Sequence, residues 1–254
     1  MNISQDGQGP TVVLSHALAL DRHMWDELTA LLAPRYRVVR YDHRGHGQGP
    51  NPDTPYTIDD LADDAAAVIR SVSSAPVVFA GLSLGGMVGQ ALAARHPSLL
   101  RGLAVINSAP HYADRTLWDT RIQAVRTTGM PAVADASIDR WLTPAFRDTA
   151  LGQSVAERLR QTLLDTDSLG YVRACEAIAA MDLRPGNRRI TTPTLIVAGR
   201  HDLATPLAQS QAIAADIAGS RVVEVESAHI SAAECPEELA RMLDDWMRTL
   251  PTPG

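Results

Sequence analysis

The stretch that decides the fold is PVVFAGLSLGGMVGQ, residues 76–90, in which an apolar run leads into Gly-Leu-Ser-Leu-Gly-Gly. The β-branched run at its start predicts a buried strand, and the residues after the glycines predict a helix. A serine between two glycines at such a junction is typical of a nucleophile elbow. Side chains at Gly81 and Gly85 would collide with the neighbouring helix and strand, which glycine avoids. The stretch therefore predicts Ser83 as a nucleophile, exposed above a sheet at the positive end of a helix.

Strand and helix patterns alternate along the first half of the chain and again near its end. Strands are predicted at 11–15, 36–42, 76–80, 103–107, 194–198 and 221–226, and helices at 24–33, 57–72, 87–95, 207–217 and 236–250. Thr57 is the expected N-cap of its helix. Such alternation implies an α/β fold with a mostly parallel sheet and helices on both faces.

The alternation breaks after Ser108. From 112 to 189 the segments look helical, and Pro131, Pro144 and Gly170 punctuate them. We therefore expect an α/β core formed by 1–111 and 190–254, with residues 112–189 inserted as a helical cap.

The composition of the chain limits the kinds of partner that it is expected to bind. The 254 residues carry a net charge of −6, and no basic run is present, which argues against a nucleic-acid partner. The apolar segments are only strand-length, so no membrane span is expected. Residues 1–7 lack the features of a signal peptide, and two distant cysteines, Cys175 and Cys235, do not form a disulfide framework. A reducing cytoplasm is the expected location.

A serine nucleophile needs a base, and the base needs an orienting acid. Loops at the carboxyl ends of strands are the useful positions in such sheets. His229 follows the strand predicted at 221–226, and Asp202 follows the one at 194–198, which gives the order serine, acid, histidine. An acid after the preceding strand is excluded, because Asn107 and Ser108 occupy that place. The alternatives are a surface-loop histidine and a turn-forming aspartate.

An oxyanion intermediate needs two preset N–H donors. The expected donors are the backbone N–H groups of Leu84, next to the serine, and of Leu18, in the loop after the first strand. His16 in that loop is interpreted as structural. His43 and His46 could suggest a metal pair, but no third ligand is evident, so we expect a structural turn there and neither metal nor cofactor.

These residues resemble the α/β-hydrolase fold family, and within it the 3-oxoadipate enol-lactonases of bacterial aromatic catabolism. The matching stretches are 24–26, 40–47, 55–58, 81–87, 118–122 and 140–147, the last two inside the insertion. The resemblance implies a hydrolase whose insertion covers the site, with Ser83, Asp202 and His229 as its triad. Dehalogenases and epoxide hydrolases of this fold use an aspartate nucleophile, which Ser83 excludes.

Two features depart from the lactonase pattern. The first loop reads Ser-His-Ala-Leu-Ala at 15–19, where the lactonases have Ser-Asn-Ser-Leu-Gly. Only about ten residues precede Thr11, so an N-terminal edge strand is expected to be missing or reduced. The first departure bears on the substrate and the second on the size of the sheet.

An enol-lactone of this pathway carries a free carboxylate, which needs a cation or several donors. Arg121 and Arg140 are candidates, with Trp118 and Trp141 as walls; the alternatives are exposed arginines and packing tryptophans. The expected partner is a small ester or lactone. The other functions left open are a broad carboxylesterase, a C–C bond or thioester hydrolase on the same triad, and a binding protein without turnover.

Overall fold

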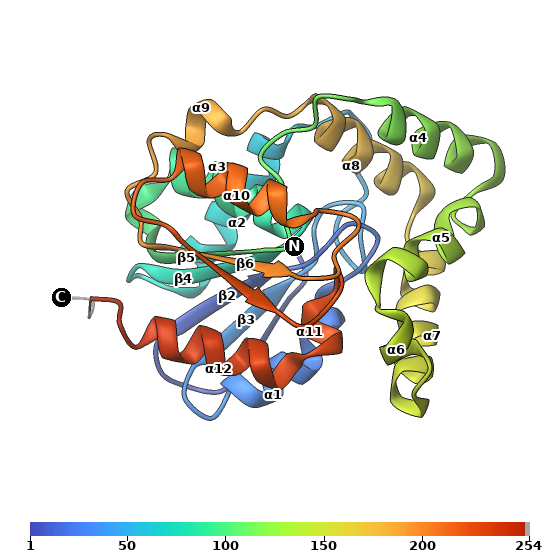
Figure 1. The fold of residues 1–254 in the computed structure, drawn as a ribbon. Helices are drawn as coiled ribbons and strands as arrows, with labels where there is room; N and C mark the ends of the chain where they lie inside the picture. The colour runs from blue at the N-terminus through green and yellow to red at the C-terminus, as the bar shows by residue number, and fades with distance from the viewer. Residues whose placement is uncertain (252–254) are drawn as a thin grey trace.

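A seven-stranded sheet lies at the centre of the computed structural model, which describes residues 1–251 (Figure 1). In spatial order the strands are β1 (Ile3–Asp6), β3 (Arg37–Tyr41), β2 (Thr11–Ser15), β4 (Val77–Leu82), β5 (Leu100–Ile106), β6 (Thr194–Gly199) and β7 (Arg221–Val225). Strand β1 is antiparallel to β3, and every other neighbouring pair is parallel. The prediction of a mostly parallel α/β sheet is confirmed.

The N-terminal edge strand is present but short. Strand β1 has four residues and pairs with β3 in a register that places Ile3 opposite Tyr41. The ten residues before Thr11 therefore supply one antiparallel strand, and β1 and β7 form the two edges of the sheet.

Helices cover both faces of the sheet (Figure 1). One face carries α2 (Ile58–Val72), α3 (Leu84–Arg95) and α10 (Leu207–Asp216), and the other carries α1 (Asp26–Leu32), α11 (Ser231–Glu234) and α12 (Pro236–Met247). Single 3-10 turns lie at Arg22–Trp25 and Pro97–Leu99. Thr57 caps α2 as predicted: its side chain accepts the Asp60 N–H, and the Asp60 carboxylate accepts the Thr57 N–H, a reciprocal pair that satisfies two free donors.

The chain between β5 and β6 forms a group of helices beyond the carboxyl ends of the strands (Figure 1). They are α4 (Thr116–Thr128), α5 (Pro131–Trp141), α6 (Pro144–Arg147), α7 (Ala150–Asp165) and α8 (Ser168–Ala180). The short α9 (Arg184–Asn187) follows them in the chain but lies beside α3 and α10 on the core. A bridge between His111 and Asp182 joins the two ends of this segment. The domain boundaries at 112 and 189 stay a prediction from the sequence.

Gly170 lies inside α8, so it does not interrupt the helix. A Cβ atom added at Gly170 would lie 2.3 Å from the carbonyl oxygen of Gly45, in the loop after β3. Glycine here allows two backbones to touch, which fixes α8 directly on the core. One hydrophobic cluster continues across this contact, because it contains Phe79 of β4 together with Trp118 and Ile138 of the inserted helices.

Candidate active site

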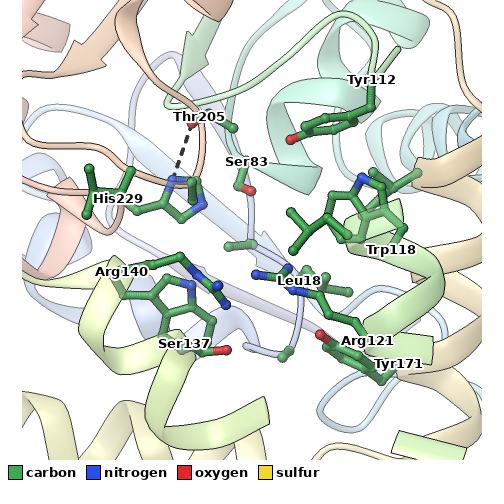
Figure 2. A pocket seen from close by; sticks show the side chains of 17 residues that line it. Leu18, Ser83, Tyr112, Trp118, Arg121, Ser137, Arg140, Tyr171, Thr205 and His229 are labelled. Carbon is green, nitrogen blue, oxygen red and sulfur yellow. Dashed lines mark hydrogen bonds between the residues drawn. The ribbon is translucent and has the colours of Figure 1, made fainter. Parts of the chain in front are cut away.

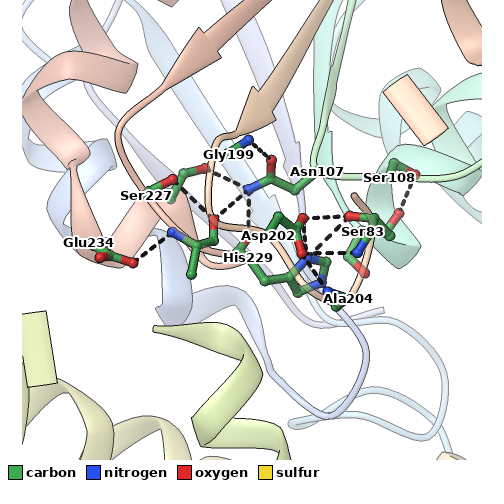
Figure 3. A network of polar contacts seen from close by, with 12 residues as sticks. Ser83, Asn107, Ser108, Gly199, Asp202, Ala204, Ser227, His229 and Glu234 are labelled. Carbon is green, nitrogen blue, oxygen red and sulfur yellow. Dashed lines mark hydrogen bonds and ion pairs between the residues drawn. The ribbon is translucent and has the colours of Figure 1, made fainter. Parts of the chain in front are cut away.

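Ser83 lies in the turn between β4 and α3, with backbone angles φ 56° and ψ −112°. Positive φ is unusual for a residue with a side chain and marks a strained turn. A Cβ atom at Gly81 would lie 2.0 Å from the Gly85 carbonyl oxygen, and one at Gly85 would lie 2.0 Å from the Ser15 carbonyl oxygen. The predicted collision at both glycines is confirmed. The Ser108 hydroxyl donates to the Ser83 carbonyl oxygen at 2.8 Å and supports the turn (Figure 3).

His229 and Asp202 form a buried pair at the ends of β7 and β6. The Nδ1 atom of His229 lies 2.8 Å from Oδ2 of Asp202. The other carboxylate oxygen accepts the backbone N–H groups of Ala204 and Thr205 at 2.8 and 2.9 Å, and the Thr205 hydroxyl donates to Oδ2 at 2.6 Å. This arrangement orients the imidazole with its Nε2 atom left free.

The environment keeps Asp202 ionised. Burial alone would raise the pKa of Asp202, but the charge of His229 and the hydrogen bonds from His229 and Thr205 outweigh burial and hold that pKa below its ordinary value. An ionised acceptor at Nδ1 means that this nitrogen carries the proton. The Nε2 atom of His229 is then able to accept a proton from a hydroxyl group.

Ser83 and His229 line the same small cavity, of about 60 Å³ (Figure 2). Within the described residues no hydrogen bond joins the Ser83 hydroxyl to His229. In unliganded enzymes such a contact is often long and shortens when substrate binds. The structure thus brings together all three side chains that the sequence singles out, Ser83, Asp202 and His229.

The two expected oxyanion donors border the cavity or the serine. Leu84 is the first residue of α3, so its N–H has no acceptor within the helix. Leu18 lines the cavity between Ala17 and Ala19, and Ala19 has φ 62°. Non-glycine residues rarely adopt such an angle, so this loop is locally strained.

A buried cluster of His16, His43 and His46, here called the histidine cluster, supports that loop from behind. His16 Nε2 accepts the His43 N–H at 2.9 Å, so its Nδ1 carries the proton and donates to the Ala17 carbonyl oxygen at 2.8 Å. Burial, with the charge of His46, lowers the pKa of His16 to about 3, and burial lowers the pKa of His46 to about 4. Within residues 1–251 no group of three or more possible ligands is arranged to hold a metal ion.

The inserted helices supply a positively charged wall to the cavity. Arg121 and Trp118 come from α4, and Arg140 and Trp141 from α5; all four line it. The Arg121 guanidinium lies 5.1 Å from the centre of the Trp118 ring. In Figure 2 the guanidinium groups of Arg121 and Arg140 point into the cavity from the side opposite Ser83.

Neither arginine forms an ion pair with any residue of the described chain. Burial and the neighbouring charge of Arg121 lower the pKa of Arg140, and the Nε atom of Arg140 is buried without a hydrogen-bond partner. Two cations that face one cavity without an acid are arranged to bind an anionic group.

The sequence reasoning missed several side chains around the cavity. Tyr112 packs edge-on against Trp118, with ring centres 5.2 Å apart, and Tyr171 of α8 closes the far wall. The position of Thr205, three residues after Asp202, was the only sequence signal for its role, because a hydroxyl in that turn can reach the carboxylate. The tyrosines come from loops and helices whose docking no local pattern specifies.

Asn107 was identified from the sequence only as a residue that is not an acid. In the structure its side-chain NH₂ donates to the His229 carbonyl oxygen at 2.7 Å, and its Oδ1 accepts the Gly199 N–H at 2.7 Å (Figure 3). Asn107 therefore joins the loop that carries His229 to the end of β6, just before Asp202.

No helix within residues 1–251 combines the length and the apolar character needed to cross a membrane. Cys175 is buried and Cys235 is half-buried, and both are free thiols.

Comparison with known proteins identifies similar chains. The sequence model for the alpha/beta hydrolase fold matches residues 10–234. The 3-oxoadipate enol-lactonase 2 of Acinetobacter baylyi is 32% identical over 250 residues, which cover 98% of this chain and 93% of that protein. The crystal structure of the enol-lactonase from Burkholderia xenovorans LB400 superimposes with a TM-score of 0.93 and 38% identity, covering 97% of this chain and 96% of that one.

A relative with a different substrate name is equally similar in sequence. The putative carbamate hydrolase RutD of Serratia proteamaculans is 32% identical over 244 residues, 94% of this chain and 91% of that protein. These similar proteins share a hydrolase fold, but their names give different substrates, an enol-lactone in two of them and a carbamate in the third.

Proposed function

Because this chain belongs to the α/β-hydrolase fold family, we propose that it is a serine hydrolase of small carboxylic esters or lactones, and that 3-oxoadipate enol-lactone is its substrate. One observation carries the proposal. A single cavity is lined by a serine on a strained turn, by a histidine paired with a buried aspartate, and by two arginines that have no acidic partner among residues 1–251.

The proposed reaction follows the serine-hydrolase scheme. The Ser83 oxygen attacks the carbonyl carbon while Nε2 of His229 takes the serine proton, and Asp202 holds the imidazole and stabilises its charged form. The N–H groups of Leu18 and Leu84 stabilise the oxyanion. The ring C–O bond then breaks, His229 returns the proton to the leaving oxygen, and the ring-opened acyl group stays on Ser83. Water, deprotonated by His229, releases the acid.

The second half of the proposal concerns substrate recognition. An enol-lactone with a free carboxylate has a lactone carbonyl that reacts and a carboxylate that the site can bind. Arg140 and Arg121 are proposed to bind the carboxylate, with Trp118 and Trp141 as the walls around the ring. The similarity to enol-lactonases at 32% and 38% identity supports this substrate class. We also propose that residues 112–189 act as the cap domain that supplies this wall.

The test compares initial rates on 3-oxoadipate enol-lactone and on p-nitrophenyl acetate. The wild type should hydrolyse the lactone with kcat/KM above about 10⁴ M⁻¹s⁻¹, far better than the simple ester. Ser83→Ala should reduce both rates by about 10⁴-fold or more. Ser210→Ala is the matched control, because Ser210 is a buried serine of α10 without a hydrogen-bond partner and outside the cavity.

Other outcomes separate the alternatives. Hydrolysis of the simple ester alone would support a broad carboxylesterase and direct attention to the unusual loop 15–19. Turnover of a carbamate, a thioester or a C–C bonded dienoate above both would replace the lactone as substrate. Unchanged activity in Ser83→Ala would contradict the serine mechanism itself.

A further inference from the structure

The two backbone amides on either side of His229 are both bound to elements outside its own loop. The Ala228 N–H donates to Oε2 of Glu234 at 3.0 Å, and the Ile230 N–H donates to the Trp141 carbonyl oxygen at 3.0 Å. Trp141 is the last residue of α5, so the second bond already connects the inserted helices to the loop of the proposed base.

Glu234 makes a second connection to the same place. Both of its oxygens lie 3.3 Å from the Thr143 backbone nitrogen, and the Thr143 hydroxyl donates to Oε1. Thr143 is also the N-cap of α6, where its hydroxyl oxygen accepts the Phe146 N–H. One carboxylate thus binds donors from the His229 loop and from the α5–α6 junction (residues 141–143) at once (Figure 3 shows the bond to Ala228).

The carboxylate of Glu234 is well placed to hold both segments. Within the described chain it forms no ion pair, so the donors from Ala228 and Thr143 are its polar partners. Hydrogen bonds to an ionised acceptor are roughly twice as strong as neutral ones. Without this acceptor the buried Ala228 N–H would have no partner, which is costly.

The α5–α6 junction directly follows Arg140, and Trp141 belongs to both the junction and the cavity wall. A displacement of the junction therefore moves the residues proposed to hold the substrate carboxylate. A displacement of the His229 loop moves the base. Glu234 accepts hydrogen bonds from both of these parts of the site.

We propose that Glu234 is a positioning residue that holds His229 in register with the substrate-binding wall of the cap, through Ala228 on one side and Thr143 on the other. The inference rests on the proposed hydrolase function. Glu234 lines no part of the catalytic cavity, so it acts through the two segments that it joins.

The test uses Glu234→Gln, Thr143→Val and Thr143→Ser. A glutamine removes the charge and leaves one neutral acceptor oxygen in place of two, so the donors of Ala228 and Thr143 lose their charged acceptor and the connection weakens. Thr143→Val removes the hydroxyl, and Thr143→Ser retains it. Thr149→Val is the matched control, because Thr149 is the N-cap of α7 and does not contact Glu234. Glu226→Gln is the control for the lost charge, because Glu226 is exposed near the same loop and pairs with Arg200 and His201.

We expect Glu234→Gln and Thr143→Val to lower kcat about tenfold with KM within about twofold, because the substrate-binding wall stays anchored to the core through α8 while the His229 loop loses its register with that wall. Thr143→Ser should restore kcat, and the controls should stay within about twofold of the wild type. The double variant should be no slower than Glu234→Gln alone, since both changes break one connection. A purely structural role would lower the melting temperature and leave kcat of the folded enzyme unchanged, which would overturn the proposal.

Hydrogen–deuterium exchange gives a readout that needs no substrate. In Thr143→Val and in Glu234→Gln, the peptide that contains residues 226–231 should exchange at least about fivefold faster than in the wild type, and in Thr149→Val it should not. If the wild type turned over none of the esters or lactones, the proposed function would fail while exchange still tested the connection. Unchanged exchange in both Thr143→Val and Glu234→Gln would show that Glu234 does not link the two segments.

Discussion

Replacing Arg140 with methionine should separate the binding of a substrate carboxylate from the chemistry at Ser83. The side chain lies in the cavity wall, has no acidic partner in the described chain, and keeps its Nε atom buried without a hydrogen bond. Methionine preserves most of the apolar stem and removes the charge. Arg140→Met should therefore leave the serine, the base and the acid in place.

The magnitude follows from the kind of contact that is lost. A hydrogen bond to a charged group contributes about 1.5–3 kcal/mol, which corresponds to a fall in kcat/KM of about 10- to 150-fold for a substrate that carries the carboxylate. A neutral ester of similar length should change by less than about threefold. The free enzyme should become slightly more stable, because burial and the charge of Arg121 both disfavour the Arg140 cation and lower its pKa. Since Arg140 is only half-buried, solvent screening limits the gain, and a rise in Tm of about 1–2 °C is expected.

The assay compares p-nitrophenyl hemiglutarate with p-nitrophenyl hexanoate in the wild type and in Arg140→Met. Arg147→Met is the control, because Arg147 is an arginine of α6, outside the cavity, that pairs with Asp139. Equal losses on both esters would mean that Arg140 supports the structure of the site and does not recognise the carboxylate. An unchanged ratio of the two rates, without any loss, would refute the reasoning in the same way.

Three further results are expected. Asp202→Asn should lower kcat by about 10³- to 10⁴-fold in steady-state assays while KM changes little, because the amide no longer holds His229 in the tautomer that accepts the serine proton; a loss below tenfold would contradict this role. In the folded protein the pKa of His16 is about 3 and that of His46 about 4, whereas the unfolded chain takes up these protons near pH 6.5, so the unfolded state binds more protons in between and stability falls as the pH is lowered through that window. Urea denaturation at pH 7, 6 and 5 should show a loss that steepens below pH 6.5 toward about 1.4 kcal/mol per pH unit for each such histidine, and His46→Gln should remove one histidine's share; a flat profile would exclude neutral buried histidines. Ala19→Gly should raise the free energy of unfolding by up to about 1 kcal/mol, because glycine relieves the positive φ, and Ala17→Gly should lower it; a destabilised Ala19→Gly would show that the loop is not strained.

The parts of the fold that local chemistry specifies were predictable. Periodicity and turn residues indicated the parallel sheet, Thr57 indicated the start of α2, and the glycines around Ser83 indicated the turn between β4 and α3. The order of strands also placed Asp202 and His229 at the same edge of the sheet, because carboxyl ends of parallel strands meet there.

The remaining features depend on contacts between distant segments. Asn107 and Glu234 bind backbone groups. Because every residue has a backbone, the sequence of the contacted segment does not reveal such a contact. Gly170 resembled a helix interruption, although its small size serves the contact with Gly45. Tyr171 reaches the cavity only because α8 docks where it does. Each of these depends on how segments far apart in the chain pack together, which no local pattern contains.

The strained backbone at Ser83 has a consequence for the history of such proteins. A residue with a side chain at φ 56° costs about 1–2 kcal/mol relative to glycine, so Ser83→Gly would relieve the turn while removing the proposed nucleophile. On the proposed mechanism, selection for turnover retains the serine against this gain in stability. In a protein released from that selection, glycine at this position would relieve the strain, whereas alanine would keep it. A glycine here in a descendant would record that the lineage had abandoned covalent chemistry and kept the fold.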